Sequence, residues 1–586
     1  MPQVIYVKRA PPKAGLSNPT VAEYVVARLA DLGIRHVFGV AGDYAFPFDN
    51  AIAASDRVSY IVSSNELNAA YAADGYARVH GAAMLTTTYV VGEASALNGV
   101  MGSKAERLPV FHLVGRPSTR LARTRRGTHH SFGDGDTDRF LSLSAISTCA
   151  SAFLTPGNTI TEMERVISAA LSQRQPAYIT APNDYALMPV IGEPIRGVPL
   201  TKAPTFSSEP RELDAALQAI MARLTKAKSP VILPAITIAR YGLQKELEAF
   251  LAATGIPFAT SGMDKGVISE SHPLYIGMYN GVSSTGDARK IVEGADLVLN
   301  LGGVLFTDFT TGVFTDHLEP SKMVTIWPDY VEIGALAEVG GRGPATFGPI
   351  HMKDVLVALT KVAPKFKTPS FSRPTPIPAS GASSDRVTNS SIYSRIQQFL
   401  APNDILIVDT NTAETALPAL LLPKDAVYLD QLVWGSIGWG TPAAFGAALA
   451  DPSRRVILIE GDGCHQLTAN EIGAMGRYGV NPIILLFNNG IFGIEEVVMG
   501  NSNPDSIRIY NKLAPWQYHK IPEAMGCRDW FCTRAETNAE FDSALQKARK
   551  HPGASYIEIL LGSKTMVPGA TPEFIDRMYQ IGPPKA

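Results

Sequence analysis

Short apolar runs rich in β-branched residues alternate with helix-length segments along most of this chain. A strand buried on both faces of a sheet appears in a sequence as such a run, and parallel strands need helical crossovers between them. The alternation therefore predicts an α/β fold of doubly wound parallel sheets. The clearest predicted strands are residues 36–40, 60–62, 110–114, 178–180, 230–233, 297–301, 405–408, 483–487 and 556–560.

Two proline-rich segments interrupt this rhythm. Residues 189–210 contain five prolines, and residues 364–386 are rich in proline and serine, as interdomain linkers often are. They divide the chain into three α/β units of similar size, at 17–190, 207–363 and 387–586. The first and third units share this architecture closely enough to suggest a degenerate duplication.

The stretch from residue 456 to residue 495 carries the most specific pattern. Its two apolar runs, 456–459 and 483–487, stop at Gly461-Asp462-Gly463 and at Asn488-Asn489. The pattern predicts a strand, a loop, a helix opening with a capping box at residues 468–471, a second strand and a second loop. Both loops then lie at the carboxyl edge of one sheet, which brings Asp462 beside Asn489.

Such a pair of oxygen ligands suits Mg²⁺ holding a diphosphate. Gly461 and Gly463 would let backbone N–H groups approach the phosphate oxygens. The alternative is two unrelated loops, because Gly-Asp-Gly is also a common turn sequence.

Bulk properties exclude several classes of protein. The 586 residues are 46% hydrophobic and 18% charged, with a net charge of −2, so neither nucleic acid nor a membrane surface is indicated as a partner. No apolar run approaches the roughly 20 residues that span a bilayer, and the N-terminus has no secretory apolar segment. Four scattered cysteines fit a reducing compartment, so a cytoplasmic, multidomain protein is expected.

Further motifs extend the pattern to nearly the whole chain. They are residues 39–44 (GVAGDY), 65–69 (NELNA), 74–78 (DGYAR), 88–92 (TYVVG), the pair His129-His130, 260–266 (TSGMDKG), 304–312 (VLFTDFTTG) and 434–438 (WGSIG). With the GDG and NN segments, the chain resembles the thiamine diphosphate-dependent 2-oxo acid decarboxylases of the pyruvate and indolepyruvate decarboxylase family. The resemblance implies a thiamine diphosphate-binding fold with a pyrimidine-binding, a central structural or regulatory, and a diphosphate-binding domain, in that order.

Glu66 is the first candidate catalytic residue. It follows the predicted strand 60–62 and precedes an alanine-rich segment that reads as a buried helix, so its carboxyl should be desolvated. The resemblance implies that it hydrogen-bonds the ring nitrogen of the cofactor's aminopyrimidine. The alternative is a glutamate stabilised at a helix start by the helix dipole.

Asp43, His129, His130 and Glu495 form a second group of candidates. Histidines and perturbed carboxylates supply acids that act near neutral pH, as protonation before aldehyde release requires. The resemblance assigns these four positions to substrate orientation, protonation and product release, without ranking the proton donors. Taken alone, the histidine pair could be a surface feature and Asp43 a turn residue.

The resemblance also implies the cofactor contacts. Ile437 would hold the cofactor in a bent shape, Thr410 would lie over it, and Ile494 would line the substrate pocket. The carbonyl of Ile491 would be the third magnesium ligand. The expected cofactor-binding set is Gly461, Asp462, Gly463, Asn489, Ile437, Thr410 and Ile494, and the expected metal set is Asp462, Asn489 and Ile491.

The implied activity is non-oxidative decarboxylation of 2-oxo acids to aldehydes and CO₂, through an ylide and an enamine of the cofactor. Residues 410–414 lack the aromatic that relatives often carry, which favours broad or larger-than-pyruvate substrates, whereas Ile494 keeps the bulk of pyruvate-preferring relatives. The alternatives are an acyloin-forming carboligase and a non-catalytic cofactor-binding protein. The resemblance implies a homodimer at least, and a homotetramer by expectation, with active sites at subunit interfaces.

Five arginines precede the histidine pair. A solvated charge run and an electrostatic funnel for the anionic substrate are both consistent with them. They are Arg116, Arg120, Arg123, Arg125 and Arg126. Near the C-terminus, residues 571–579 are expected to form a short helix.

Overall fold

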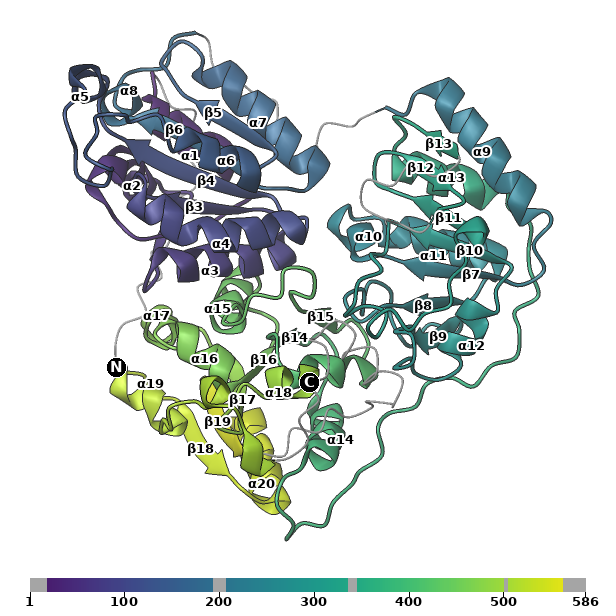
Figure 1. The fold of residues 1–586 in the computed structure, drawn as a ribbon. Coiled ribbons are helices and arrows are strands. Elements are labelled where there is room, and N and C mark those ends of the chain that lie inside the picture. Colours follow the sequence, from purple (N-terminus) through teal and green to yellow (C-terminus); the bar gives the residue numbers. More distant parts are fainter. Residues whose placement is uncertain (1–17, 193–206, 336–344, 500–503, 562–586) are drawn as a thin grey trace.

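The structure is a computed structural model that describes residues 18–192, 207–335, 345–499 and 504–561. Three sheets, each flanked by helices, account for the described part of the chain (Figure 1). The α/β prediction is confirmed, and all nine predicted strands are strands. The expected helix at residues 571–579 lies outside the described residues.

The first sheet has six parallel strands in the order β2-β1-β3-β4-β6-β5. The strands are β1 (His36–Gly39), β2 (Ser59–Val62), β3 (Ala83–Thr87), β4 (Val110–Arg116), β5 (Ala150–Phe153) and β6 (Ala177–Pro182). The helices are α1 (Val21–Ala30), α2 (Phe46–Ala54), α3 (Glu66–His80), α4 (Val91–Ala105), α5 (Thr119–Thr124), α6 (Leu141–Ser147), α7 (Thr159–Gln173) and α8 (Asn183–Ala186). Every residue of β3, β4 and β6 is buried, as expected for parallel strands that are covered on both faces of a sheet.

The middle sheet has seven strands in the order β13-β12-β11-β10-β7-β8-β9. It is parallel except at one edge, where β11, β12 and β13 pair antiparallel. The strands are β7 (Pro230–Pro234), β8 (Phe258–Thr260), β9 (Tyr275–Met278), β10 (Leu297–Leu301), β11 (Met323–Ile326), β12 (Val331–Ile333) and β13 (Ala345–Phe347). The helices are α9 (Pro210–Leu224), α10 (Ile236–Arg240), α11 (Gln244–Thr254), α12 (Ala288–Glu293) and α13 (Met352–Val362).

The third sheet is again six parallel strands, in the order β15-β14-β16-β17-β19-β18. Numbered within its own unit, this order is that of the first sheet. The strands are β14 (Ile405–Val408), β15 (Val427–Leu429), β16 (Val456–Gly461), β17 (Ile483–Asn488), β18 (Phe531–Ala535) and β19 (Ser555–Leu560). The helices are α14 (Asn389–Phe399), α15 (Gly440–Ala450), α16 (Asp462–Thr468), α17 (Glu471–Tyr478), α18 (Gly493–Val498), α19 (Ile521–Ala524) and α20 (Asn538–Lys550).

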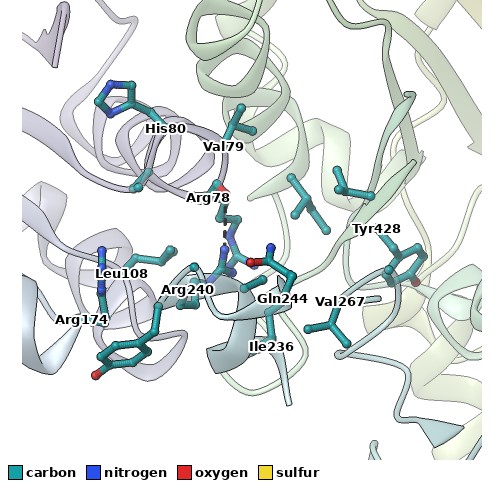
Figure 2. A pocket seen from close by; sticks show the side chains of 18 of the residues that line it. Arg78, Val79, His80, Leu108, Arg174, Ile236, Arg240, Gln244, Val267 and Tyr428 are labelled. Carbon is teal, nitrogen blue, oxygen red and sulfur yellow. Dashed lines mark hydrogen bonds between the residues drawn. The ribbon is translucent and has the colours of Figure 1, made fainter. Parts of the chain in front are cut away.

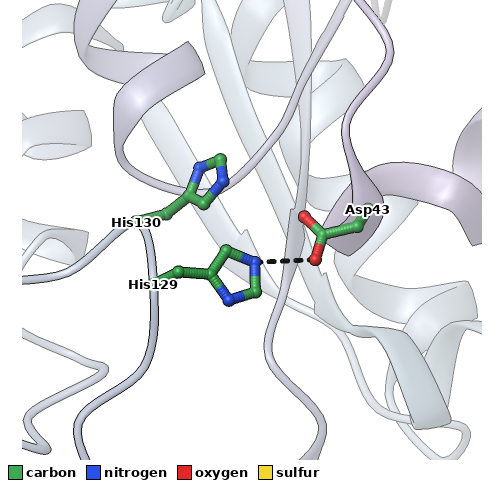
Figure 3. A group of neighbouring side chains, drawn as sticks. All are labelled: Asp43, His129 and His130. Atoms are coloured by element: carbon green, nitrogen blue, oxygen red, sulfur yellow. Dashed lines mark hydrogen bonds and ion pairs between the residues drawn. The ribbon is translucent and has the colours of Figure 1, made fainter.

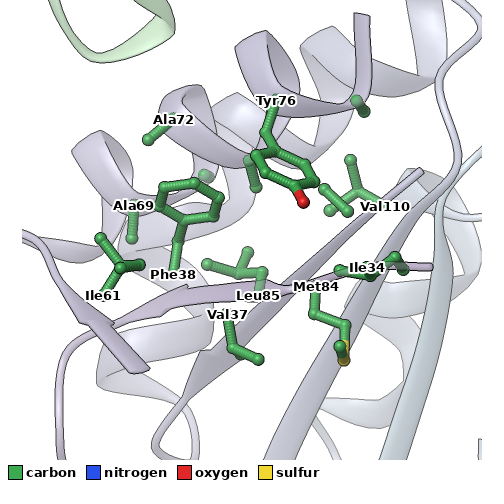
Figure 4. Packing of buried hydrophobic residues seen from close by; sticks show 14 of the residues in the cluster. Ile34, Val37, Phe38, Ile61, Ala69, Ala72, Tyr76, Met84, Leu85 and Val110 are labelled. Atoms are coloured by element: carbon green, nitrogen blue, oxygen red, sulfur yellow. The ribbon is translucent and has the colours of Figure 1, made fainter. Parts of the chain in front are cut away.

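One hydrophobic core runs through the first and third units, whereas the middle unit has cores of its own. Figure 4 shows its part between the first sheet and α3, where Phe38 and Tyr76 pack edge-to-face with ring centroids 5.7 Å apart. Phe38 also meets Phe445 of α15 at 6.2 Å. Apolar burial therefore fixes α3 between its own sheet and the third unit.

Helices α3 and α15 cross at glycines. A Cβ atom on Gly75 would lie 2.1 Å from the Ala443 carbonyl oxygen, and one on Gly446 would lie 1.8 Å from that of Ala72. Only the absence of a side chain at both positions permits this approach. The crossing fixes where the N-terminus of α3, with Glu66, lies relative to the third unit.

The expected capping box at residues 468–471 is wrong. The helix begins instead at Glu471, after Asn470, and has no side-chain cap. The Thr468 hydroxyl donates to the carbonyl of Gly438, while the Asn470 and Glu471 side chains accept hydrogen bonds from Asn68 of the first unit. These side chains join two units, so they do not cap a helix.

Residues 364–386 form neither helix nor strand and lead from the middle unit to the third (Figure 1). Among the described helices, none has both the length and the apolar character to cross a bilayer.

Candidate active site

Glu66 occupies the first position of α3, directly after the N-cap residue Asn65. The Asn65 side chain accepts a hydrogen bond from the Asn68 N–H and so fixes the helix start. The Glu66 carboxylate is half-buried, and its Oε1 lies 3.3 Å from where a Cβ on Gly92 would stand. Helix α4 thus begins close against this carboxylate because it carries no side chain at Gly92.

Asp43, His129 and His130 come together on the first unit, although Asp43 and His129 are 86 positions apart in the sequence (Figure 3). One ligand atom from each lies within 4.8 Å of the others. His129 Nε2 is 2.7 Å from Asp43 Oδ2, and the two side chains are 58% and 45% exposed. The cluster therefore presents an exposed imidazole held by a carboxylate.

Tyr44 packs against both histidines of this cluster. Its ring stacks on His129 with centroids 4.8 Å apart, and its hydroxyl is 3.4 Å from His129 Nδ1. It also meets the ring of His130 edge-on at 5.9 Å. Tyr44 was not among the candidates from sequence. The only signal for it there is its position, as an aromatic residue directly after Asp43.

The GDG segment is a strand end and a helix start, not the expected loop. Strand β16 runs through Gly461, and α16 begins at Asp462. The Asp462 carboxylate accepts the N–H of Gly490 at 2.7 Å and that of Gly463 at 3.1 Å. The two segments therefore meet at the carboxyl edge of the third sheet. Burial raises the pKa of Asp462 to about 6 despite these donors.

The adjoining turn carries the other predicted ligands. Asn489 Oδ1 accepts the N–H of Ile491 at 3.1 Å, and Gly490 has a left-handed φ of 75°. A Cβ on Gly490 would meet no atom within 4 Å, so the backbone there faces open space. The buried Thr410 hydroxyl oxygen, also in the predicted set, has no hydrogen-bond partner.

These features fit a magnesium diphosphate group. A buried carboxylate, an amide and a backbone carbonyl are the hard oxygen ligands that Mg²⁺ takes. An unpartnered buried hydroxyl costs free energy that an oxygen-rich ligand would recover. The glycine backbone leaves room for that ligand to approach.

The remaining candidates stand apart from the histidine cluster. Ile437 is half-buried in the segment before α15, and Ile494 is half-buried in α18. Glu495 is exposed on α18 and does not belong to the cluster of Asp43 and the histidines. The candidates thus form two sets, one on the first unit and one on the third.

A buried carboxylate that sequence reasoning missed organises the third unit's set. Asp409 accepts N–H groups from Thr410 at 2.8 Å, Gly438 at 3.1 Å and Gly440 at 3.0 Å. Burial, and then the charge of Glu460, raises the pKa of Asp409 to about 8. It ties the segment with Ile437 to the end of β14. The signal that could have identified Asp409 in the sequence is its position directly after a predicted strand of four apolar residues.

The five arginines before the histidine pair do not share one environment in the folded protein. Arg116 is buried, donates to the carbonyl of Thr137 and lies 2.6 Å from Asp138 Oδ1. It therefore belongs to the packing of the loop that follows β4 and not to a solvated surface. The other four arginines, at positions 120, 123, 125 and 126, are exposed in and after α5.

Three family models match the chain. They are the thiamine pyrophosphate enzyme N-terminal TPP binding domain at residues 19–138, the central domain at 217–342 and the C-terminal TPP binding domain at 416–559. Thiamine pyrophosphate is another name for thiamine diphosphate.

Curated relatives match over nearly their whole length. An alpha-keto-acid decarboxylase of Mycolicibacterium paratuberculosis is 35% identical over 573 residues, which are 97% of this chain and 98% of the relative. Proteins of the same name from Mycobacterium bovis and Mycobacterium leprae are both 36% identical, covering 90% of this chain and 92% and 90% of their own lengths.

Proposed function

We propose a working arrangement for this chain from the premise that it belongs to the family of thiamine diphosphate-dependent 2-oxo acid decarboxylases. It is an enzyme of that class and binds thiamine diphosphate. When bound, the cofactor supplies the nucleophilic carbon and the electron sink that loss of CO₂ requires. The products are CO₂ and an aldehyde with one carbon fewer than the substrate.

The third unit, at 387–586, holds the diphosphate end. Asp462, Asn489 and the Ile491 carbonyl bind Mg²⁺, while Gly461 and Gly463 admit the phosphate oxygens. The hydrogen bond from the Gly490 N–H to Asp462, which joins the two segments, supports this assignment. Thr410, Ile437 and Ile494 contact the rest of the cofactor.

The first unit, at 17–190, supplies the pyrimidine end and the proton donors. Glu66 hydrogen-bonds the aminopyrimidine, and the close approach of α4 at Gly92 supports this role because it fixes one side of the carboxylate. Asp43 orients His129 through the 2.7 Å contact, and His130 completes the group. Glu495, on α18 of the third unit, joins this group across the subunit interface. The middle unit, at 207–363, has a structural role.

A single chain keeps its two sets of candidates on separate units, so we assign the active site to the interface of a homodimer, with a homotetramer as the complete assembly. Apolar side chains beside the site support this. Phe46 and Val91 are each 50% exposed, and Leu467 is 49% exposed, close in sequence to Asp43, Gly92 and Asp462 respectively. A partner subunit would cover them. The four cysteines are free thiols, which favours a cytoplasmic location.

The substrates we propose are a broad set of 2-oxo acids, including ones larger than pyruvate. The segment after Thr410 forms a short 3₁₀ helix at Thr412–Thr415 and contains no aromatic residue. Less bulk there leaves room for a longer substrate chain.

Aldehyde release, coupled to an alcohol dehydrogenase, tests the proposal. The panel is pyruvate, a branched 2-oxo acid, phenylpyruvate and indolepyruvate, each with and without thiamine diphosphate and Mg²⁺. We expect turnover that depends on both and extends to the large acids. Strict preference for pyruvate would refute the substrate assignment, and acyloin in excess of free aldehyde would make carboligation the main activity.

A further inference from the structure

The cluster of Asp43, His129 and His130 brings together side chains of the kinds that bind transition-metal ions (Figure 3). One carboxylate oxygen and two imidazole nitrogens lie within 4.8 Å of one another. In the described part of the chain, this is the one group of three histidine, cysteine or acidic side chains placed to hold an ion. Two imidazoles and a carboxylate are a common protein ligand set for Zn²⁺.

The cluster needs only small side-chain movements to close around such an ion. Zinc lies about 2.0–2.2 Å from nitrogen and oxygen ligands, so three ligand atoms of one tetrahedral ion are about 3.3 Å apart. His129 Nε2 and Asp43 Oδ2 are closer than this, at 2.7 Å, and the other separations are at most 4.8 Å. Because both of these side chains are about half exposed, they can rotate into place without disturbing a packed core.

The surroundings of the two histidines suit metal-bound imidazoles. A histidine that binds a metal through one nitrogen usually donates a hydrogen bond from the other. For His129 to bind through Nε2, its proton must lie on Nδ1, and the Tyr44 hydroxyl oxygen is 3.4 Å from that atom. The Tyr44 ring stacks on His129 and meets His130 edge-on, which orients both imidazoles. His130 Nδ1 is buried without a hydrogen-bond partner, so the chain alone does not satisfy this imidazole.

The ligand types separate this cluster from the magnesium site proposed on the third unit. Mg²⁺ prefers oxygen ligands, whereas imidazole suits Zn²⁺, Co²⁺ and similar ions. Asp462 and Asn489 offer oxygen atoms, and the cluster on the first unit offers two nitrogens. Zn²⁺ and Mg²⁺ therefore favour different units of the fold.

A second gathering of titratable side chains does not compete for the ion. A cavity of about 390 Å³ lies between the end of α3, α10 and β15 (Figure 2). Arg78, Arg174 and Arg240 line it, and none of its lining residues is acidic. Its positive charge repels cations, so a divalent ion is drawn to the cluster beside Tyr44 instead.

We propose that Asp43, His129 and His130 bind Zn²⁺ and that the bound ion inhibits the enzyme. Three protein ligands leave the fourth position of a tetrahedral ion for water or for the carboxylate of a 2-oxo acid. The ion occupies imidazole nitrogens that proton transfer requires, so turnover stops while it is bound. The inhibition rests on the proposed catalytic role of these residues, whereas the binding does not.

Cobalt(II), whose visible spectrum reports its coordination, tests the binding. It is titrated into the full-length holoenzyme with saturating thiamine diphosphate and Mg²⁺. We expect the intense bands of four-coordinate cobalt, which octahedral cobalt on oxygen ligands lacks, and we expect Zn²⁺ to remove them by displacement.

Variants locate the bound ion. Asp43→Asn and His130→Gln should each weaken cobalt binding by about 100-fold or more, since loss of even an outer partner costs about 10–100-fold. His317→Gln, at an exposed histidine outside the cluster, is the matched control and should bind like the parent. Absent bands, or unchanged affinity in both cluster variants, would overturn the site.

Aldehyde release in the presence of Zn²⁺ tests the inhibition. We expect turnover of the parent enzyme to fall as Zn²⁺ fills the site and to return when a zinc-selective chelator is added. Raising Mg²⁺ about tenfold should not restore it, because Mg²⁺ does not compete for imidazole. Relief by Mg²⁺ would place the inhibiting zinc at Asp462 and overturn the proposed inhibition. Metal binding without loss of turnover would uphold the site but refute the inhibition, and with it the role of His129 and His130 in proton transfer.

Discussion

The crossing of α3 and α15 predicts a large effect from adding one methyl group. In Gly446→Ala the new Cβ would stand 1.8 Å from the Ala72 carbonyl oxygen and 2.8 Å from the Tyr76 nitrogen. Ordinary contact begins at 3.4 Å, so the two backbones must separate by about 1.6 Å. No flexible side chain can yield here, because the atoms it meets are backbone.

The cost follows from packing. Overpacking a well-filled core costs about 1–3 kcal/mol, and alanine returns at most about 1 kcal/mol of helix propensity. We expect Gly446→Ala to lower the urea midpoint accordingly. Because α3 carries Glu66, the variant should also lose turnover at temperatures where it is still folded.

A second helical glycine provides the matched control. A Cβ on Gly473 in α17 would have its nearest neighbour at 3.8 Å, an ordinary contact. Gly473→Ala should therefore stabilise the protein by about 0.5–1 kcal/mol. If Gly446→Ala proves as stable and active as Gly473→Ala, the close crossing is not a feature of the folded protein.

Two further predictions concern titrating groups on the first unit. Burial raises the pKa of Asp49 from 3.8 to about 7, so the folded state keeps a proton that the unfolded chain releases, and stability falls as pH rises through that window. Asp49→Asn keeps the acceptor for the Thr86 hydroxyl. Its free energy of unfolding should match that of the parent at about pH 4 and exceed it at about pH 8, by at most about 4 kcal/mol. Equal stability of the two proteins at both pH values would contradict this. Asp43→Asn should lower kcat/KM by about 10²-fold and change its pH profile, measured by aldehyde release, because His129 loses its carboxylate partner; an unchanged profile would remove His129 from proton transfer.

Many of the strands could be predicted from the sequence for a physical reason. Parallel strands that are buried on both faces are mostly apolar, and eight of the nine named runs lie in strands that are almost wholly buried, the exception being residues 60–62 in β2. Asp462 and the turn at Asn489 meet because parallel strands end at one edge. Strands such as β3 and β5 escaped notice because threonine, alanine and serine make them less apolar.

Features that depend on tertiary contacts, above all those between units, could not be predicted from the sequence. Residues 468–471 have the sequence of a capping box, yet the Asn470 and Glu471 side chains bond Asn68, some 400 positions away. Within the first unit, Arg116 looked like one of five equivalent arginines, but its burial and its hydrogen bonds to Thr137 and Asp138 set it apart.

A complementation assay tests the central claim most directly, that Glu66 and Asp462 serve one active site from different units of the fold. Glu66→Gln and Asp462→Ala are each assayed for aldehyde release, alone and after coexpression. We expect Glu66→Gln to bind thiamine diphosphate without turnover and Asp462→Ala to lose the cofactor.

In a mixed dimer with sites at the interface, one site carries both changes and the other carries neither. Random pairing then restores about a quarter of the parent activity. Full activity in both single variants would contradict the site itself. Inactive single variants and an inactive mixture, with mixed dimers shown to form, would contradict its placement between subunits.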